Sequence, residues 1–462
     1  MATLKELSKR ESAMTAGHRM CPGCTAPIIV KLVTMATTKP LVISCATGCL
    51  EVSSTIYPYS AWNCSFIHNA FENSAATMSG VEAAYNALRR RGKLKDEFKF
   101  IAFGGDGGTY DIGLQSLSGA MERAHDMLYV CYDNGAYMNC LSTDSMIMTE
   151  NGLKKITEVK EGDNVYAFDQ KTHQLVLKEC SGVFDNGVQD VYELSTLHHS
   201  IKATSNHPFL IFEKNSNKEM GPVIRQTKNN ILVWKTLEKI MVGDEVVAFK
   251  DLQKEFEYEE VINIRYIGKE PTLDLRVEDE HNFIADGIVV HNTGVQRSSA
   301  TPRGANTTTS PVGKVETGKK EYRKNLTEIM VAHRIPYIAQ ASPSHWNDLV
   351  RKTEKALSIK GPKFMNTIMP CTLGWVFPPE QGIEIAKLAV ETCFWPLYEV
   401  ENGKYTINYK PKEIKPLTEF INTQSRFSHL KKEENKHIVE ELQADVKKEW
   451  EDLLKKEELT KQ

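Results

Sequence analysis

The sequence has no long hydrophobic run. No apolar stretch reaches the roughly 18 to 20 residues that span a membrane, and the first residues, Met-Ala-Thr-Leu-Lys-Glu, lack the apolar centre of a signal peptide. Charge of one sign is also scarce, because 57 lysines and arginines nearly balance 60 aspartates and glutamates and leave a net charge of -3. We therefore expect a cytoplasmic protein whose partners include neither a membrane nor a nucleic acid.

Cysteine, by contrast, occurs ten times in the 462 residues. In a chain without an export signal, cysteines are more often metal or redox ligands than disulfide partners. The pair Cys21-Pro-Gly-Cys24 has the spacing of such ligands. The length is sufficient for two or three domains.

Most of the chain has an α/β pattern. A strand over residues 98–103, a glycine-rich turn, a helix over 114–123 and a strand over 127–132 form a predicted βαβ unit. The pattern resumes after residue 293, where we predict a strand over 335–341, a helix over 345–356, a strand over 363–369 and a hairpin over 397–408. The charged amphipathic tail over 429–459 predicts a solvated or subunit-contacting helix.

The segment from residue 140 to residue 292 has a different character. Short strand-like pieces are separated by turn signals such as Asn151-Gly152 and Asp185-Asn-Gly187. The polar stretch from Glu213 to Asn230 predicts a flexible loop. The segment is therefore predicted to be an all-β module.

The two ends of this module carry groups that can cut and rejoin a chain. It begins at Cys140 and ends at His291-Asn292, directly before the hydroxyl residue Thr293. Deleting it joins Asn139 to Thr293 in one coherent segment, and inside it Thr204-Ser-Asn-His207 supplies a second polar group and an imidazole. Together these residues resemble a mini-intein, a protein-splicing domain of the Hint family.

The first splicing step needs a thiol and help for a departing amine. The Cys140 thiol takes the acyl group of Asn139 from nitrogen to sulfur. His207 is expected to donate a proton to the amine, and Thr204 to polarise or strain the scissile amide.

The later steps use the other end of the module. The Thr293 hydroxyl attacks the thioester, and the Asn292 side chain attacks its own carbonyl with the assistance of His291. The resemblance implies that Asp274 coordinates the first and third steps and that His281 is a further histidine near the junction.

The predicted domain boundaries follow from these ends. The module, 140–292, has 153 residues, which is close to a bare splicing domain and leaves no room for a homing endonuclease. We therefore expect no DNA cleavage. The host is discontinuous, with residues 1–139 and 293–462, and keeps 309 of the 462 residues.

A candidate cofactor site lies in the host. Gly105-Asp106-Gly107 falls at a strand-to-helix turn, where a carboxylate can hold Mg²⁺ and backbone N–H groups can receive phosphate oxygens. Asn134 follows Asp106 by 28 residues, at the end of the next strand, so both side chains project from one sheet edge. The pairing resembles the Mg²⁺ and thiamine diphosphate motif, which implies the Ala136 carbonyl as a further ligand.

Four cysteines fit one iron–sulfur cluster. Cys21 and Cys24, together with Cys49 and Cys371, can complete a four-thiolate set for a 4Fe-4S cluster. A Cys-x-x-Cys pair alone suits zinc or a redox pair equally well. The remaining thiols are expected to be ordinary buried or surface groups: Cys45, Cys64, Cys131, Cys180 and Cys393.

With these motifs and the joined segment Tyr-Met-Asn-Thr-Gly-Val-Gln-Arg-Ser, the host resembles the β subunits of pyruvate:ferredoxin oxidoreductases. The resemblance covers residues 1 to 139 and 293 to about 425. It implies an α/β thiamine diphosphate-binding fold interrupted by an all-β Hint-type intein domain. The implied reaction converts pyruvate, coenzyme A and oxidised ferredoxin into acetyl-CoA, CO₂ and reduced ferredoxin, with electrons passing through the cluster.

The resemblance also implies partners and a consequence for the unspliced chain. An α subunit would supply the pyrimidine-binding domain, and small γ and δ subunits would carry further clusters. In the family the residue matching Asn139 lies beside the thiazolium and the substrate. We therefore expect the unspliced chain to be inactive, its host existing as two halves held apart.

Three alternatives stay open. A non-redox thiamine enzyme such as a decarboxylase would keep Asp106 and Asn134 but has no use for four cluster-spaced cysteines. The substrate of the spliced enzyme can instead be another 2-oxoacid, such as a branched-chain one. Finally, a precursor stalled in splicing would have self-processing as its only activity.

Overall fold

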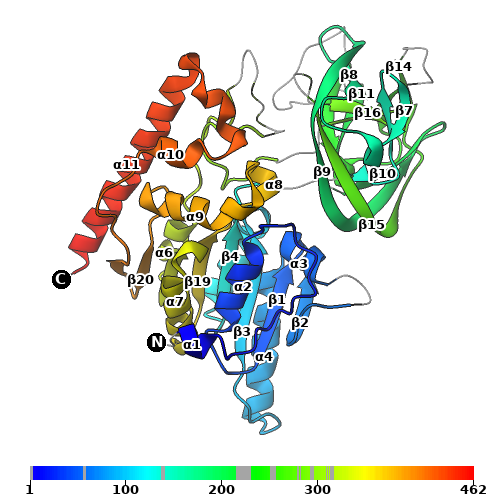
Figure 1. Cartoon of the computed structure of the whole chain (residues 1–462). Helices are drawn as coiled ribbons and strands as arrows, with labels where there is room; N and C mark the ends of the chain where they lie inside the picture. Colours follow the sequence, from blue (N-terminus) through cyan, green and yellow to red (C-terminus); the bar gives the residue numbers. More distant parts are fainter. Residues whose placement is uncertain are drawn as a thin grey trace. The chain divides into compact units, whose positions relative to one another are not determined.

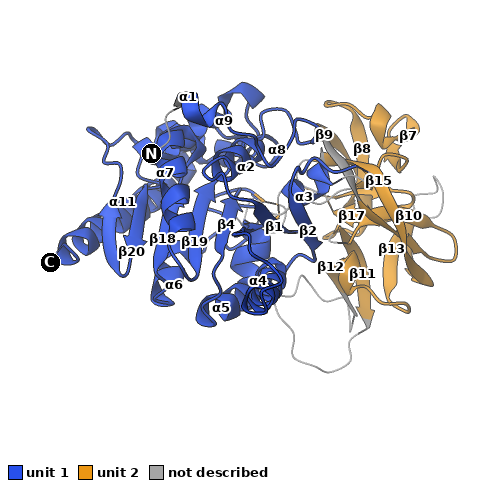
Figure 2. Ribbon diagram, turned by 90° about the horizontal axis from the view of Figure 1, so that it is seen from below, with its two compact units in different colours: residues 1–137, 297–306, 310–462 blue, residues 138–296, 307–309 orange. Residues whose placement is uncertain are grey.

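The computed structural model describes residues 4–55, 59–136, 141–205, 207–214, 230–249, 256–277, 280, 282–291, 296–307, 310, 312 and 317–461. The chain forms two compact units (Figure 2). The host unit comprises Met1–Tyr137, Arg297–Asn306 and Ser310–Gln462, and the insert unit comprises Met138–Gln296 and Thr307–Thr309. Within the described residues, no helix is long and apolar enough to cross a membrane.

The host unit is built on an eight-stranded sheet in the order β2-β1-β3-β4-β19-β18-β20-β21 (Figure 1). The six strands from β2 to β18 are parallel, whereas β20 and β21 form the predicted antiparallel hairpin. The strands are β1 (Leu41–Ala46), β2 (Ser65–Asn69), β3 (Lys99–Gly105), β4 (Leu128–Asp133), β18 (Tyr337–Ala341), β19 (Lys363–Ile368), β20 (Tyr398–Glu401) and β21 (Lys404–Ile407).

Helices cover both faces of this sheet because its strands are apolar on both sides. Phe100 and Ala102 of β3 join a core with α4, α5, α6 and α11, whereas Ile101 and Phe103 join a second core with α2 and α7. The helices of the host unit are α1 (Leu4–Leu7), α2 (Ala26–Thr34), α3 (Cys49–Ser54), α4 (Ser74–Arg90), α5 (Leu114–Glu122), α6 (Leu326–Ala332), α7 (Trp346–Ser358), α8 (Thr372–Trp375), α9 (Gly382–Glu391), α10 (Leu417–Ile421) and α11 (Lys436–Leu459).

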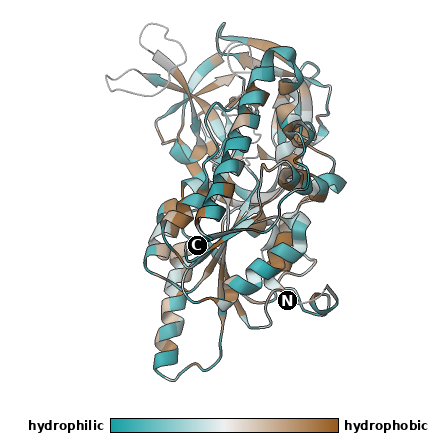
Figure 3. Ribbon diagram, turned by 90° about the vertical axis from the view of Figure 1, so that its left-hand side faces the viewer, coloured by the Kyte–Doolittle hydropathy of each residue, from teal (hydrophilic) through white to brown (hydrophobic). Residues whose placement is uncertain are grey.

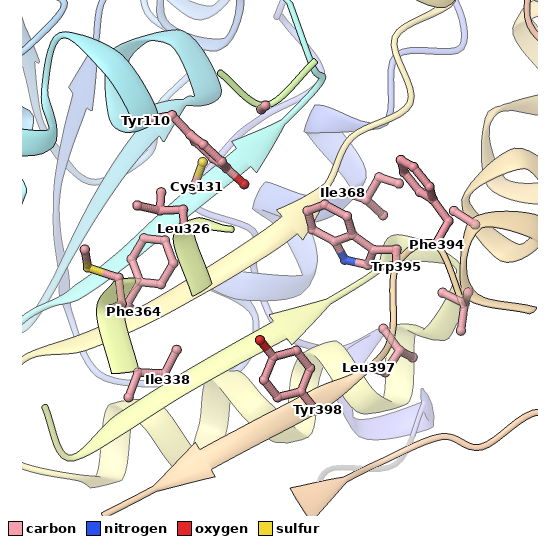
Figure 4. Packing of buried hydrophobic residues seen from close by; sticks show 14 of the residues in the cluster. Tyr110, Cys131, Leu326, Ile338, Phe364, Ile368, Phe394, Trp395, Leu397 and Tyr398 are labelled. Atoms are coloured by element: carbon pink, nitrogen blue, oxygen red, sulfur yellow. The ribbon is translucent and has the colours of Figure 1, made fainter. Parts of the chain in front are cut away.

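The two sequence halves of the host are joined in this one sheet. β4, which precedes the insert, pairs in parallel with β19, which follows it, from Leu128 opposite Lys363 to Asp133 opposite Ile368. Side chains from both halves fill one core, where Tyr110 and Cys131 lie near Leu326 and Phe364 (Figure 4). The expectation of two halves held apart was therefore wrong, because the host sheet is complete in the uncut chain.

The C-terminal helix is part of the host core. We predicted a helix over 429–459 that is solvated or contacts another subunit, but α11 begins at Lys436, after a short 3-10 helix over Ser425–Lys431. Ile438, Leu442 and Trp450 of α11 are buried in the larger hydrophobic core of the host unit. The visible face of this helix, which leads to the C-terminus, is mostly hydrophilic (Figure 3).

The insert unit is all-β, as predicted, and its strands form a largely antiparallel sheet. The strands are β5 (Leu141–Ser142), β6 (Met146–Thr149), β7 (Gly152–Lys155), β8 (Asn164–Asp169), β9 (Gln174–Ser195), β10 (Ser200–Thr204), β11 (Pro208–Lys214), β12 (Asn230–Thr236), β13 (Glu245–Phe249), β14 (Phe256–Glu260), β15 (Asn263–Val277), β16 (Asn282–Ala285) and β17 (Ile288–His291). Most of the predicted loop at 213–230 lies outside the described residues.

One predicted turn is instead an irregularity within a long strand. Asp185-Asn-Gly187 lies inside the 22-residue strand β9, which pairs with β15 from Cys180 to Ser195. Thr272 pairs with Gly187 and Leu273 with Asp185, so the register shifts by one residue there. The Asn-Gly signal therefore marks a β-bulge, because the continuous partner strand holds both sides of it in the sheet.

Candidate functional site

The predicted cofactor residues of the host lie at one edge of the sheet. Asp106 directly follows β3 and Asn134 directly follows β4, and these two strands are parallel neighbours. Cys49 follows β1, and Cys371 follows β19, which flank the same pair of strands. The carboxyl ends of four adjacent strands thus gather residues from both sequence halves at the position where open α/β sheets bind ligands.

Asp106 is a buried carboxyl group that lacks full hydrogen bonding. Its side chain is buried, its Oδ1 accepts a hydrogen bond from the Asn134 N–H at 3.3 Å, and no described residue donates one to Oδ2. Burial, followed by the charge of Asp133, holds the pKa of Asp106 well above its ordinary range, although Ser298 partly offsets this. A bound cation would satisfy Oδ2, so the carboxyl group fits a Mg²⁺ site.

The turn after β4 is held from three sides. The Asn134 Oδ1 accepts a hydrogen bond from the Ala136 N–H at 3.0 Å, and the Asn134 carbonyl accepts one from the Trp375 indole at 2.5 Å. The Gly135 carbonyl accepts one from the Thr301 hydroxyl at 2.7 Å. Gly135 has a φ of +67°, a left-handed conformation that favours glycine. The turn that carries two of the predicted Mg²⁺ ligands is thus preorganised.

The glycines around Asp106 allow close packing. A Cβ at Gly105 would lie 3.2 Å from the Tyr132 ring, and one at Gly108 would lie 2.7 Å from the Phe71 carbonyl oxygen. A π-helical turn over Gly107–Asp111 starts immediately after Asp106, whereas the sequence predicted no helix before residue 114. The carboxyl group therefore stands at the first turn of a helix, where amide N–H groups lack intrahelical partners.

A buried charged network lies behind this edge. Asp133 Oδ2 accepts a hydrogen bond from the Tyr110 hydroxyl at 2.6 Å and lies 3.5 Å from Arg323 Nη2. Burial raises the pKa of Asp133, and the Arg323 guanidinium opposes that effect. No sequence pattern indicates this network. Asp133 is recognisable only as the acidic neighbour of Asn134, and nothing in the sequence points to Arg323.

The first described residues after the insert are anchored to the same edge. Lys319 Nζ donates hydrogen bonds to the carbonyls of Ser298, Ser299 and Thr301 at 3.3, 3.2 and 2.6 Å. The Ser299 N–H donates to Asp111 Oδ2 at 3.1 Å. Burial lowers the pKa of Lys319 to about 8. Residues from both sides of the insertion therefore contact each other beside Asp106 and Asn134.

The loop that contains Cys21 and Cys24 is hydrogen-bonded to the loop that contains Cys371. The Thr25 hydroxyl donates to the Pro370 carbonyl at 3.2 Å, and the Thr372 hydroxyl donates to the Pro22 carbonyl at 3.4 Å. Gly23 has a φ of +73°, and a Cβ there would lie 2.2 Å from the Pro379 carbonyl oxygen. Only glycine therefore fits at position 23 of the Cys-x-x-Cys pair.

The cysteines themselves are partly brought together. Burial raises the pKa of Cys24 to about 12 and that of Cys371 to about 11, and each is raised further by a neighbouring cysteine. Cys21 contributes to both shifts, whereas Cys49 acts on the buried Tyr132. Among the described residues, no three histidine, cysteine, aspartate or glutamate side chains form a group that could hold a metal ion. The four-cysteine set therefore stays a prediction.

In the insert unit, strand pairing places the predicted splicing residues around its first described residue. Leu141, which follows Cys140 in the sequence, pairs with Ala203 of β10 on one side and with Leu273 of β15 on the other. Thr204 and Asp274 come directly after these two partners, and both are buried. The N-terminal end of the insert thus lies between the strands that carry two of its predicted catalytic residues.

The other predicted groups lie on the strands next to the C-terminal end. His207 is fully buried, its N–H donates to the Thr204 carbonyl at 2.9 Å, and its ring lies edge-on to Phe209. Phe209 pairs with Val290 of β17, the residue before His291. The His291 and Trp234 rings meet edge-to-face, with their centroids 4.7 Å apart. Pairing of β11 with β17 therefore joins the segment that contains His207 to the end of the insert.

The bond-forming residues of the predicted splicing reaction lie outside the described part of the chain. These are Asn139, Cys140, Asn292 and Thr293, together with His281. Asn282, which no sequence pattern indicates, is fully buried and exchanges hydrogen bonds with the backbone of Phe168 at 2.7 and 2.9 Å. It also pairs with His291, so it fixes β16 beside the final strand. A lone asparagine carries no sequence signal for this bracing role.

Comparison with family models identifies both parts of the chain. The intein splicing domain matches residues 146–292. The C-terminal TPP binding domain of thiamine pyrophosphate enzymes matches residues 46–170. The chain thus contains a thiamine diphosphate-binding fold and, inserted in it, an all-β intein domain, as the sequence predicted.

Curated relatives match along nearly the whole chain. Subunit PorB of pyruvate synthase from Thermotoga maritima is 37% identical over 464 aligned residues, which cover 99% of this chain and 96% of the relative. Subunit VorB of ketoisovalerate oxidoreductase from Pyrococcus abyssi is 30% identical, with 96% and 93% covered. Among solved structures, a DnaB intein from Synechocystis sp. matches with a TM-score of 0.28 and 25% identity, covering 33% of this chain and 98% of that one.

Proposed function

The chain belongs to the PorB family of pyruvate synthase subunits, interrupted by an intein, and from this we propose that it is a self-splicing precursor of such a subunit. The match to PorB over almost the entire chain carries this proposal. The mature subunit would act in the cytoplasm on pyruvate, coenzyme A and ferredoxin. It would assemble with an α subunit that completes the thiamine site and with γ and δ subunits that carry further clusters.

The proposed intein extends from Cys140 to Asn292, and its excision joins Asn139 to Thr293. The N–S acyl shift breaks the Asn139–Cys140 amide and forms a thioester, and His207 and Thr204 assist as the amine is protonated. The Thr293 oxygen then displaces the Cys140 thiol and forms an ester, which links the two host halves.

Cleavage at the other junction completes the reaction. The Asn292 side-chain nitrogen attacks its own carbonyl carbon, releasing the Thr293 amine and leaving a cyclic imide on the intein. His291 assists as acid or hydrogen-bond donor, with Asp274 and His281 as supporting groups. The Thr293 amine then takes the acyl group from its own oxygen, and an ordinary peptide bond results. The burial of Thr204, His207 and Asp274 beside the ends of the insert supports these roles.

In the mature host, we assign Mg²⁺ binding to Asp106, Asn134 and the Ala136 carbonyl, and diphosphate binding to the turn that contains Gly105 and Gly107. The unsatisfied Oδ2 of Asp106 supports this assignment. When bound, thiamine diphosphate would supply a nucleophilic carbon and an electron sink for the decarboxylation of a 2-oxoacid. The chain's own contribution is to orient the cofactor, while Trp375 and Thr301 hold the turn in place. Asn139 is assigned to contact the substrate.

We assign Cys21, Cys24, Cys49 and Cys371 to one 4Fe-4S cluster. The mutual influence of Cys21, Cys24 and Cys371 supports three of these four ligands. Because burial keeps Cys24 and Cys371 protonated, both thiols would release protons on binding iron.

Pyruvate is the proposed substrate, and a branched-chain 2-oxoacid is the second candidate because the VorB relative is also similar over nearly its full length. The test is dye reduction by the spliced protein assembled with its α, γ and δ subunits. Pyruvate should support faster reduction than 2-oxoisovalerate, and the reverse order would establish the second candidate. If the spliced complex reduces the dye with neither substrate, the proposed oxidoreductase function is overturned.

A further inference from the structure

Arg426 is a buried arginine beside the candidate cofactor edge, and no sequence motif includes it. Only 3% of the residue is exposed. Its Nε donates a hydrogen bond to the Gln424 side-chain oxygen at 2.8 Å, whereas its buried Nη1 makes no hydrogen bond with a described residue. A buried guanidinium with an unsatisfied donor is energetically unfavourable unless an anion is bound there.

The position of Arg426 is fixed by groups from both candidate cofactor sites. Its guanidinium stacks 4.1 Å from the centroid of the Trp375 ring, and the indole N–H of Trp375 donates to the Asn134 carbonyl. A Cβ placed on Gly135 would lie 3.3 Å from Arg426 Nη1. Trp375 ends helix α8, whose first turn is capped by the Cys371 sulfur, which accepts a hydrogen bond from the Gly374 N–H at 3.2 Å.

The charge of Arg426 acts on both sites. When ionised, Asp133, Cys371 and Asp106 would each favour its protonated form, with Asp133 having the largest effect. Burial outweighs them and lowers the pKa of Arg426 to about 9, so the group keeps its positive charge at neutral pH. A cation in a buried position interacts more strongly with nearby anions than it would in water.

We propose that Arg426 is a positioning residue shared by the two cofactor sites, with its guanidinium stabilising negative charge at the Asp106 edge and at Cys371. This inference rests on the proposed function, because it assumes that Mg²⁺ and thiamine diphosphate bind at Asp106 and that a cluster binds Cys371. With both groups bound, the unsatisfied Nη1 is available to an anionic oxygen or sulfur. The positive charge would also favour cluster reduction, because reduction adds an electron to a group nearby.

The test uses the spliced subunit in its complex and the variants Arg426→Met, Arg426→Gln and Arg426→Lys. Two quantities are measured: the dissociation constant of thiamine diphosphate with Mg²⁺, by calorimetry, and the midpoint potential of the cluster, by a redox titration followed by electron paramagnetic resonance. Arg426→Met should weaken cofactor binding roughly 10- to 100-fold, as loss of supporting residues around metal ligands does. It should also lower the potential. Arg426→Lys should restore the potential but only part of the cofactor affinity, since lysine lacks the planar fork.

Arg303→Met is the matched control. Arg303 also stacks on an aromatic ring, 4.3 Å from the centroid of Tyr322, but it pairs with Glu441 and Asp445 of α11. This variant should leave both quantities unchanged. If Arg426→Met prevents assembly, the comparison of Arg426→Gln with Arg426→Lys decides, because Gln keeps a donor and lacks the charge.

Two outcomes distinguish the inference from the function on which it rests. Wild-type affinity and potential in a neutral Arg426 variant would overturn the shared role while leaving the proposed function intact. A wild-type complex that binds neither thiamine diphosphate nor a cluster would instead overturn the proposed function itself.

Discussion

The host and the insert assemble their candidate sites in different ways. In the host, the candidate residues follow the carboxyl ends of parallel strands, and the strands come from both sides of the insertion. In the insert, they lie on antiparallel strands that pair with the segments at the insert's own two ends. A parallel sheet therefore brings together residues far apart in sequence, whereas the insert places its predicted splicing groups on strands that pair with its first and last described strands.

This difference explains how one chain can hold two sites before it is cut. The host sheet pairs β4 with β19 in the uncut chain, and Ser299 and Thr301 already contact Asp111 and Gly135. Splicing therefore has no sheet to assemble. Its proposed role is to restore the covalent segment that contains Asn139 next to a preorganised cofactor edge.

The largest expected effect comes from removing the chemistry of the insert alone. The double variant Cys140→Ala with Asn292→Ala lacks the thiol and the cyclising amide, so it should remain entirely as the 52.1 kDa chain. In assembled complexes it should give no pyruvate-dependent dye reduction. Its circular dichroism spectrum should nevertheless be that of a folded protein, which is the control. Substantial pyruvate-dependent dye reduction by this variant would contradict the assignment of residue 139 to the active site.

Replacing His207 by Ala should slow thioester formation by about 10² to 10⁴, the usual contribution of a general acid. Splicing is followed over time on a denaturing gel. His173→Ala is the control, because this histidine lies in the turn between β8 and β9 and has no proposed catalytic role. An unchanged rate in His207→Ala would show that another group protonates the amine.

The core of one unit can be weakened without the other. Trp450→Ala should destabilise the host by about 3 to 5 kcal/mol, because the indole of this α11 residue is buried in the host core. Calorimetry of the non-splicing double variant should show a lower unfolding temperature for the host unit and an unchanged unfolding temperature for the insert unit. Equal shifts of both transitions would mean that the two units unfold together.

Asp106→Asn should weaken the binding of Mg²⁺ with thiamine diphosphate at least 10- to 100-fold, the range seen when even supporting residues of metal sites are lost. Calorimetry on the spliced complex measures this. The splicing rate should be unchanged, because Asp106 is part of the host edge. Slower splicing in this variant would reveal coupling between the sites that strand pairing does not explain.

The smallest effect is a pH dependence at the same carboxyl group. Burial and Asp133 raise the pKa of Asp106 in the folded host, so a proton competes with Mg²⁺ below that pKa. Affinity for Mg²⁺ should rise by up to about tenfold per pH unit as the pH approaches the raised pKa, and then level off. The free energy of unfolding should fall as the pH rises through the same range, because burial favours the neutral carboxyl group over the charged one. Asp106→Asn should flatten the affinity profile, and a flat profile in the wild type would contradict the competition.

Much of this architecture could be predicted because its signals are local. The apolar run before Gly105 and the turn residues of the hairpin over 397–408 give their elements directly, and deletion of 140–292 restores a continuous host pattern. The bulge at Asp185-Asn-Gly187 could not be predicted, since its outcome depends on the distant partner strand β15. The C-terminal helix itself was predicted, but its burial was not, because the host core that covers the apolar face of α11 comes from distant parts of the chain.

The site shows a similar division. Asp106 and Asn134 are recognisable because each follows an apolar strand, which fixes the edge of the sheet that they share. Arg323 and Arg426 are not, because their roles arise from packing against Asp133 and Trp375. Single residues that act through long-range burial leave no periodic signal in the sequence.

Mass spectrometry of the purified protein tests the central claim most directly. The claim predicts a tryptic peptide that contains the Asn139–Thr293 bond and ends Tyr-Met-Asn-Thr-Gly-Val-Gln-Arg, together with a separate intein from Cys140 to Asn292. Recovery of only the intact 52.1 kDa chain from folded protein, with no such peptide, would contradict it.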